Sequence, residues 1–75
     1  MITQDLLNWI TPLLYPPELD ILKYHTKHTI QGIRIKNWNG VLKKYNLSHH
    51  QLKKTIARFR ALILIYELEV AAFNL

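Results

Sequence analysis

The last third of the 75-residue chain carries an apolar repeat that constrains its fold more than any other feature. Apolar residues recur there with alternating steps of four and three, and the repeat is unbroken from Leu52 to Phe73. With this period a helix presents one continuous seam to a partner helix or to a core. The segment therefore predicts one long helix. Its seam consists of Leu52, Ile56, Phe59, Ile63, Tyr66, Val70 and Phe73.

The two halves of this helix are expected to differ in what covers them. From Leu52 to Ile63 the seam is expected to be the core face of the domain. Beyond Ala61 the helix is apolar almost all round, since Leu64 and Leu68 lie off the seam, and such a helix must be covered on every side. The rest of so small a chain covers only part of it, so we expect a homodimer. Its dimerisation residues are expected to be Ile63, Tyr66, Val70 and Phe73.

Three shorter helices are expected upstream of the long one. The first spans residues 3–14, where Pro12 either kinks the helix or stops it, because an interior proline removes a backbone hydrogen bond. The second spans residues 17–25 and opens with a proline followed by acidic residues. The third follows Asn37, a good capping residue, and ends near Tyr45.

The stretch YNLSHHQ joins the third helix to the fourth. Asn46 is the best residue other than glycine for a left-handed helix stop. Ser48 is followed three positions later by Gln51, which is the spacing of a capping box at a helix start. Two helices joined in this way form a helix-turn-helix hairpin.

Residues 26–36 have no single clear pattern. Ile33 and Ile35 alternate with Arg34 and Lys36, which is typical of a short strand or an extended connector. A helical period also fits roughly, but β-branched residues and Gly32 disfavour a helix. We expect a loop, with a short extended connector at 29–36.

The expected fold class is therefore all-α. It is a small four-helix domain that spans residues 1–75, with a helix-turn-helix at 38–60 and a packing and dimerisation helix at 61–73. A chain of this length buries only roughly 60% of its unfolded surface, so it lies near the lower limit for independent folding.

The charged residues are segregated along the chain. All ten basic residues lie between Lys23 and Arg60, and all five acidic residues lie outside that window, which leaves a net charge of +5. A stretch so uniformly positive repels itself unless an anion is nearby. Nucleic acid is the commonest partner of such a stretch, and a membrane surface is the second.

Several classes of function are disfavoured by the residues present. There is no cysteine, so neither a disulfide framework nor a thiolate metal site is expected. His25 and His28 are spaced as a metal pair on a helix, but no carboxylate accompanies them. No glycine-rich phosphate loop or catalytic constellation is present, so we expect neither an enzyme nor a cofactor. The start has no secretory pattern and the longest apolar run is too short to cross a bilayer, so we expect a cytoplasmic, nucleoid-associated protein without a membrane partner.

The segment GVLKKYNLSHHQLKKTI, residues 40–56, resembles the helix-turn-helix of LuxR-type response regulators and of region four of bacterial sigma factors. Val41 matches the first buried aliphatic residue of the motif, and Leu47 matches the buried turn residue. Residues 17–25, within YPPELDILKYH, resemble the scaffold helix that precedes the motif in those families. The chain departs from them at Leu42, where they keep alanine, and in a longer connector before the motif.

The resemblance implies a recognition helix that enters the major groove of double-stranded DNA with its N-terminal residues towards the base edges. The residues that it leaves outward or flanking are His49, His50, Gln51, Lys54 and Arg58. Gln51 suits adenine, and Lys54 and Arg58 suit either guanine or phosphate. Those that it assigns to phosphates are Lys43, Lys44, Lys53 and Arg60.

Two functions are therefore expected as alternatives. The first is a dimeric, sequence-specific transcriptional regulator that binds double-stranded DNA. The second is a helical adaptor whose basic face docks on an acidic protein partner.

Overall fold

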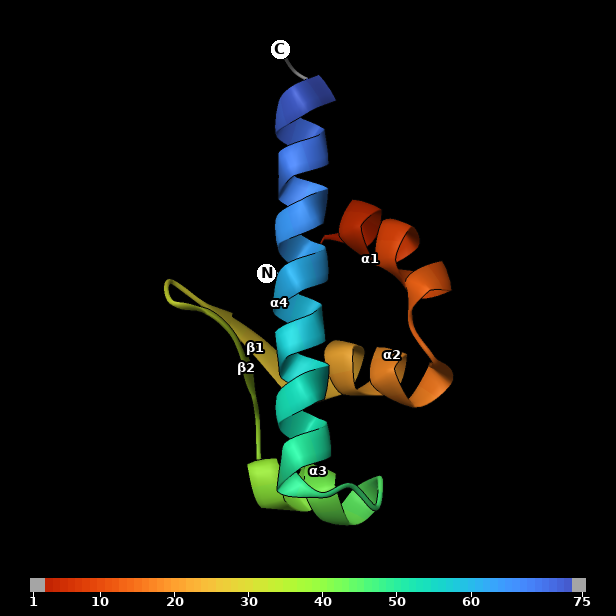
Figure 1. The fold of residues 1–75 in the computed structure, drawn as a ribbon, viewed down its shortest axis with the longest axis vertical. Coiled ribbons are helices and arrows are strands. Elements are labelled where there is room, and N and C mark those ends of the chain that lie inside the picture. The colour runs from red at the N-terminus through yellow and green to blue at the C-terminus, as the bar shows by residue number, and fades with distance from the viewer. Residues whose placement is uncertain (1–2, 74–75) are drawn as a thin grey trace.

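The computed structural model describes residues 3–73. The long helix α4 (His49–Phe73) forms the axis of the molecule, and the shorter elements pack along its N-terminal part (Figure 1). The molecule is elongated, with extents of 43 × 26 × 19 Å. The last turns of α4 project beyond the other elements, as Figure 1 shows.

The expectation of an all-α fold is wrong, because residues 26–35 form an antiparallel hairpin of β1 (Thr26–Thr29) and β2 (Gly32–Ile35). The alternation of apolar and basic residues that favoured an extended connector lies in β2. Its apolar residues form the inner face of the strand, where Ile33 is buried. Two residues join the strands, and Gly32 follows them with a φ of +114°, a conformation that residues with a side chain rarely adopt. The sheet covers one side of α4 (Figure 1).

The first helix ends at its proline rather than bending there. Helix α1 (Gln4–Ile10) is capped by Thr3, whose Oγ1 accepts a hydrogen bond of 3.2 Å from the backbone N–H of Leu6. A single 3₁₀ turn, η1 (Thr11–Leu13), follows and contains Pro12. The expected helix over residues 3–14 is therefore two elements.

Helix α2 (Pro16–Tyr24) starts one residue before the expected position. Glu18 fixes its first turn, because its Oε1 accepts a hydrogen bond of 3.0 Å from the backbone N–H of Tyr15. A proline in the first turn is tolerated because its missing N–H would have no partner within the helix.

Helix α3 (Trp38–Lys44) begins at an unusual cap. Asn37 adopts a φ of 52°, and its side-chain oxygen accepts a hydrogen bond of 3.3 Å from the N–H of Gly40. A side chain at position 40 would collide with the amide of Asn37. This close approach explains why a glycine, which disfavours helices, lies inside α3.

The helix-turn-helix connection is formed as the sequence predicts. Asn46 has a φ of 53°. The backbone N–H of Ser48 donates to Oε1 of Gln51 over 2.8 Å, and the N–H of Gln51 donates to Oγ of Ser48 over 3.1 Å. These reciprocal bonds are the capping box, and they fix the start of α4.

The core lies where the first half of α4 meets α1, α2, α3 and the hairpin. Phe59 at the centre of this contact has no exposed surface. The upstream helices contribute the aliphatic side chains that surround it, and strand β2 contributes one more. The core consists of Leu6, Ile10, Ile21, Leu22, Ile33, Val41, Leu52, Ile56, Phe59 and Ile63.

Candidate nucleic-acid interface

The first two turns of α4 have a buried side and an outward side. Leu52 and Ile56 are buried, whereas His50, Lys53 and Lys54 are exposed. Helical spacing places these three exposed residues together on the side opposite the core. Within the described part of the chain, their side chains make no hydrogen bond or ion pair. They are therefore free to contact a partner.

His49 is exposed but already has a partner in α3. The indole N–H of Trp38 donates to its Nδ1 over 2.9 Å. The two rings also stack, with 6.1 Å between their centroids and 22° between their planes. Only Nε2 of the imidazole remains for an external contact. His49 thus joins the two helices of the motif as well as facing solvent.

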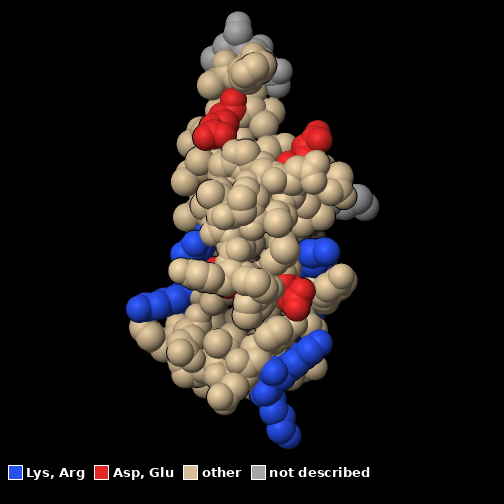
Figure 2. Space-filling model, turned by 90° about the vertical axis from the view of Figure 1, so that its right-hand side faces the viewer, with Lys and Arg blue, Asp and Glu red and all other residues tan. Residues whose placement is uncertain are grey.

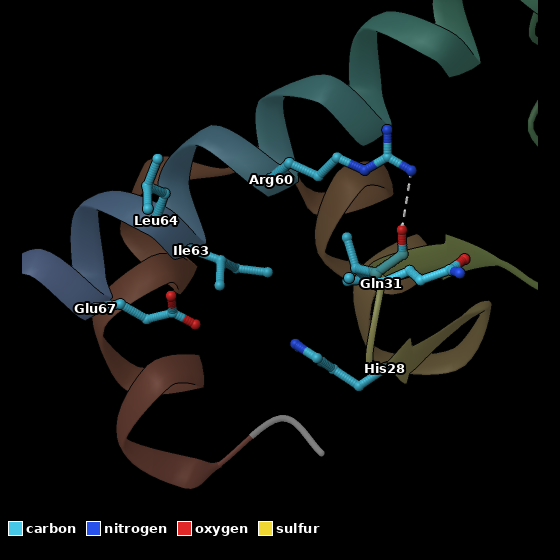
Figure 3. A pocket seen from close by; sticks show the side chains of 8 residues that line it. His28, Gln31, Arg60, Ile63, Leu64 and Glu67 are labelled. Atoms are coloured by element: carbon cyan, nitrogen blue, oxygen red, sulfur yellow. Dashed lines mark hydrogen bonds between the residues drawn. The ribbon is translucent and has the colours of Figure 1, made fainter.

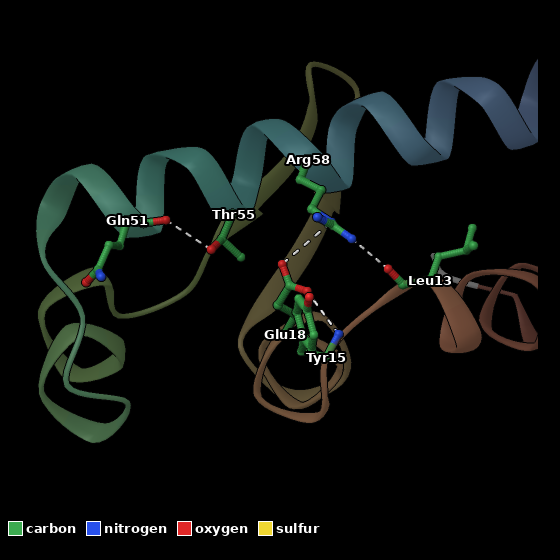
Figure 4. Close-up of polar contacts among 6 residues, drawn as sticks. All are labelled: Leu13, Tyr15, Glu18, Gln51, Thr55 and Arg58. Carbon is green, nitrogen blue, oxygen red and sulfur yellow. Dashed lines mark hydrogen bonds and ion pairs between the residues drawn. The ribbon is translucent and has the colours of Figure 1, made fainter.

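The side chain of Gln51 is likewise engaged, because its carbonyl oxygen closes the capping box with Ser48. Its backbone carbonyl also accepts a bond of 3.0 Å from Oγ1 of Thr55, as Figure 4 shows. Only the amide NH₂ group of Gln51 remains available. In a contact with a base, the side chain of Gln51 can therefore only donate a hydrogen bond.

Arg58 contacts the linker between α1 and α2. Its Nη2 donates to the backbone oxygen of Leu13 over 2.7 Å, and its Nε lies 3.7 Å from a carboxylate oxygen of Glu18 (Figure 4). The guanidinium group therefore holds the upstream helices against α4. The structure separates Arg58 in this way from the free lysines of the outward side.

Arg60 also makes a contact within the fold. Its Nη2 donates to the backbone oxygen of Ile33 over 3.2 Å, which fastens β2 to α4 (Figure 3). The guanidinium group has five N–H donors, so several remain after this bond. Arg60 therefore serves the fold and still presents positive charge beside the hairpin.

Lys43 and Lys44 lie in the last turn of α3 and are exposed. Positive charge is favourable at this end of a helix, because the backbone carbonyls there carry partial negative charge. The ammonium group of Lys44 lies 5.5 Å from the centre of the Tyr45 ring, within range of a cation–π contact. Both lysines lie at the end of α3, before the turn that leads into α4.

The basic residues do not merge into one continuous patch on the face that Figure 2 shows. Lysine and arginine side chains occur there at several separate places over the lower half of the molecule. Acidic side chains lie between and above them. The candidate interface therefore consists of the free lysines of the helix-turn-helix, rather than of all basic residues between Lys23 and Arg60.

Two hollows are lined by residues of both the hairpin and α4. One, of about 350 Å³, is lined by Arg34, Trp38 and Arg60 together with two isoleucines. The other, of about 230 Å³, lies further along α4, where His28 and Glu67 point into it (Figure 3). Arg34 was not among the residues that the sequence predicted for the site, and residues 26–36 were expected to be a loop.

The residues expected to form a dimer fall into two groups. Ile63 is 8% exposed and belongs to the core, and the ring of Tyr66 lies 5.5 Å from that of Trp9. The indole N–H of Trp9 also donates to a carboxylate oxygen of Glu69 over 3.1 Å, which ties α1 to this part of α4. Val70 and Phe73, in contrast, are exposed. Other exposed apolar residues of the same segment are Leu64, Ile65 and Leu68.

Comparisons with protein-family models, with curated proteins and with solved structures find no match to this chain. Within residues 3–73, no group of three or more histidine, cysteine or acidic side chains is placed to hold a metal ion. Over the same residues, every helix is too short or too polar to cross a membrane.

Proposed function

We propose that this protein binds double-stranded DNA through the first two turns of α4. The observation that carries the proposal is the outward side formed by His50, Lys53 and Lys54. These side chains lie in the first two turns of α4, which starts with a capping box. Within the described residues they make no hydrogen bond or ion pair. The major groove of DNA admits an α-helix, and its phosphates attract lysine.

The proposed roles of the basic residues differ from one another. His50 and Lys54 are assigned to base edges, together with the free Nε2 of His49 and the amide NH₂ of Gln51. Lys53, Lys43 and Lys44 are assigned to phosphates, where a flexible point charge is sufficient. Arg58 is a supporting residue in this proposal, because its guanidinium group already contacts Leu13 and Glu18.

The biological role that we propose is regulation of transcription by a nucleoid-associated protein. A helix-turn-helix on a chain of 75 residues presents one short reading helix. Such modules commonly bind as dimers, with two reading helices in successive major grooves. This step rests on the proposed DNA binding.

We also propose a homodimer, formed through the exposed apolar part of α4. Leu64, Leu68 and Phe73 are the largest contributors, and Phe73 is 93% exposed. Burying such surface against a second copy is favourable by about 25 cal/mol per Å². Leu64→Asp with Leu68→Asp is expected to convert a dimer to a monomer in light scattering coupled to size exclusion. A wild-type monomer at high micromolar concentration would contradict the dimer.

A helical adaptor remains the second candidate, because the same exposed apolar residues fit a protein partner. In that case the free lysines contact acidic side chains instead of phosphates. The two candidates differ in one respect, which is whether duplex DNA alone is sufficient for binding.

Fluorescence anisotropy with a labelled random duplex tests the proposal. We expect binding at about 50 mM salt that weakens steeply by about 200 mM, with a log–log slope of roughly −0.9 for each phosphate contact. Lys54→Glu is expected to weaken binding at least tenfold. Lys23→Glu is the matched control, because it makes the same charge change at an exposed residue of α2 rather than of α4. Absence of wild-type binding at low salt would exclude the DNA proposal and favour the adaptor.

A further inference from the structure

The outer face of the hairpin carries positive charges in direct opposition. Lys27 and Arg34 are register partners on the two strands, and both are exposed. Lys36 follows two residues after Arg34 and is also exposed. Like charges directly opposite each other destabilise a sheet. No acidic residue lies within the hairpin itself, so neither strand supplies a counter-charge to this pair.

Arg34 also borders a hollow formed by residues of the hairpin, α3 and α4. Arg34, Trp38 and Arg60 are among the residues that line it. One N–H group of Arg34 donates to Oε1 of Gln31 over 2.5 Å, and one of Arg60 donates to Ile33. Each guanidinium group retains other donors that face no acceptor within the described chain. Two residues that carry guanidinium groups thus border one open hollow of about 350 Å³.

This hollow is continuous with the helix-turn-helix. The Trp38 ring that lines it also stacks on His49, the first residue of α4. Lys53 lies one turn beyond His49, and Arg60 lies two turns beyond Lys53, so the three share one flank of α4. A ligand that runs along this flank would contact α4 and the hairpin together.

We propose that the hairpin is a second DNA-binding element, in which Arg34 and Arg60 bind a phosphate of the backbone that flanks the groove entered by α4. The inference rests on the proposed DNA binding and deepens it. Guanidinium groups suit this role because their fork of donors matches phosphate oxygens. Lys27 and Lys36 add charge beside the same strand. The bound phosphate supplies the counter-charge that the opposed cations of the hairpin lack.

The test compares salt dependence of duplex binding for the wild type and Arg34→Gln, with Lys23→Gln as the charge-matched control. We expect Arg34→Gln to reduce the magnitude of the log–log slope by about 0.9, the value for one phosphate contact. Lys23→Gln is expected to leave the slope unchanged. Arg34→Lys is expected to keep the slope, because its charge remains, and to weaken binding at every salt concentration.

Thermal unfolding of the free variants separates binding from folding. We expect Arg34→Gln to keep or raise the melting temperature, because it removes the repulsion with Lys27. If Arg34→Gln lowers both the melting temperature and the magnitude of the salt slope, the Arg34 side chain stabilises the fold, and the proposal is overturned. If Arg34→Gln has the same slope as the wild type while Lys54→Gln has a smaller one, the hairpin contact alone is overturned. No wild-type binding at all would overturn both proposals.

Competition with inorganic phosphate at constant ionic strength identifies the source of the phosphate. We expect free phosphate to leave the duplex bound, since the proposed site gains its affinity from the adjoining contacts of α4. Displacement by free phosphate that Arg34→Gln abolishes would assign the hollow to a small phosphate ligand and overturn the backbone assignment.

Discussion

The indole N–H of Trp38 donates a hydrogen bond of 2.9 Å to Nδ1 of His49, and the two rings stack on each other. Trp38 is the first residue of α3, and His49 is the first residue of α4. The contact spans the whole helix-turn-helix and joins the starts of its two helices. It therefore sets the direction in which α4 presents its free lysines.

We expect His49→Ala to lower the free energy of unfolding by about 1 kcal/mol, the usual loss for one hydrogen bond. His50→Ala is the control, because this neighbouring side chain is exposed and has no partner within the described residues. It should change the free energy by less than about 0.5 kcal/mol. Urea unfolding measures both, and equal effects would show that the Trp38 contact does not stabilise the fold.

Arg58 and Lys54 lie one turn apart on α4, and they are expected to respond differently to the loss of charge. Arg58→Met keeps the apolar stem but removes the bonds to Leu13 and Glu18. We expect it to lower the free energy of unfolding by about 1 kcal/mol. Lys54→Met should leave stability within about 0.5 kcal/mol and weaken DNA binding more strongly. The reverse order in either measurement would place Arg58 in the interface.

His25 carries a buried nitrogen, Nε2, that has no hydrogen-bond partner within the described residues. Its ring meets the edge of the Tyr45 ring, with 5.6 Å between the centroids. Phenylalanine has a similar shape and no polar atom to bury, so His25→Phe should stabilise the fold by about 1 kcal/mol. The urea midpoint should rise with an unchanged m-value. Destabilisation by His25→Phe would indicate that a bound water or another group satisfies Nε2.

The helical part of the fold follows from local signals in the sequence. Ser48 and Gln51 form the capping box that their spacing predicts, and Asn46 adopts the left-handed conformation expected of a helix stop. These predictions succeed because a cap or a turn depends on residues only three or four positions apart. The seam from Leu52 to Ile63 is buried for a similar reason, since one helix period fixes which residues share a face.

The hairpin could not be predicted in the same way. The alternation of Ile33 and Ile35 is visible, but the partner strand, residues 26–29, has only polar side chains, of which Thr26 is buried. The connecting residues Ile30 and Gln31 also lack the asparagine–glycine pair that marks many short hairpins. The strand pairing therefore depends on packing against α4, which no local pattern reveals.

The contacts of the basic residues on α4 could not be predicted from the sequence. The sequence identifies Lys53 and Arg58 alike as basic residues of one helix. Only the fold reveals that Arg58 reaches back to residues 13 and 18, forty or more positions away along the chain. The same holds for Arg60 and the backbone of Ile33.

The most direct test of the account is a map of amide chemical-shift changes in the labelled protein as duplex DNA is added. We expect the largest changes at the start of α4, around His50 and Lys54, and at the end of α3. The exposed apolar part of α4, residues 64–73, should change little. Changes confined to that apolar part, or spread evenly over the chain, would contradict DNA binding through the first turns of α4.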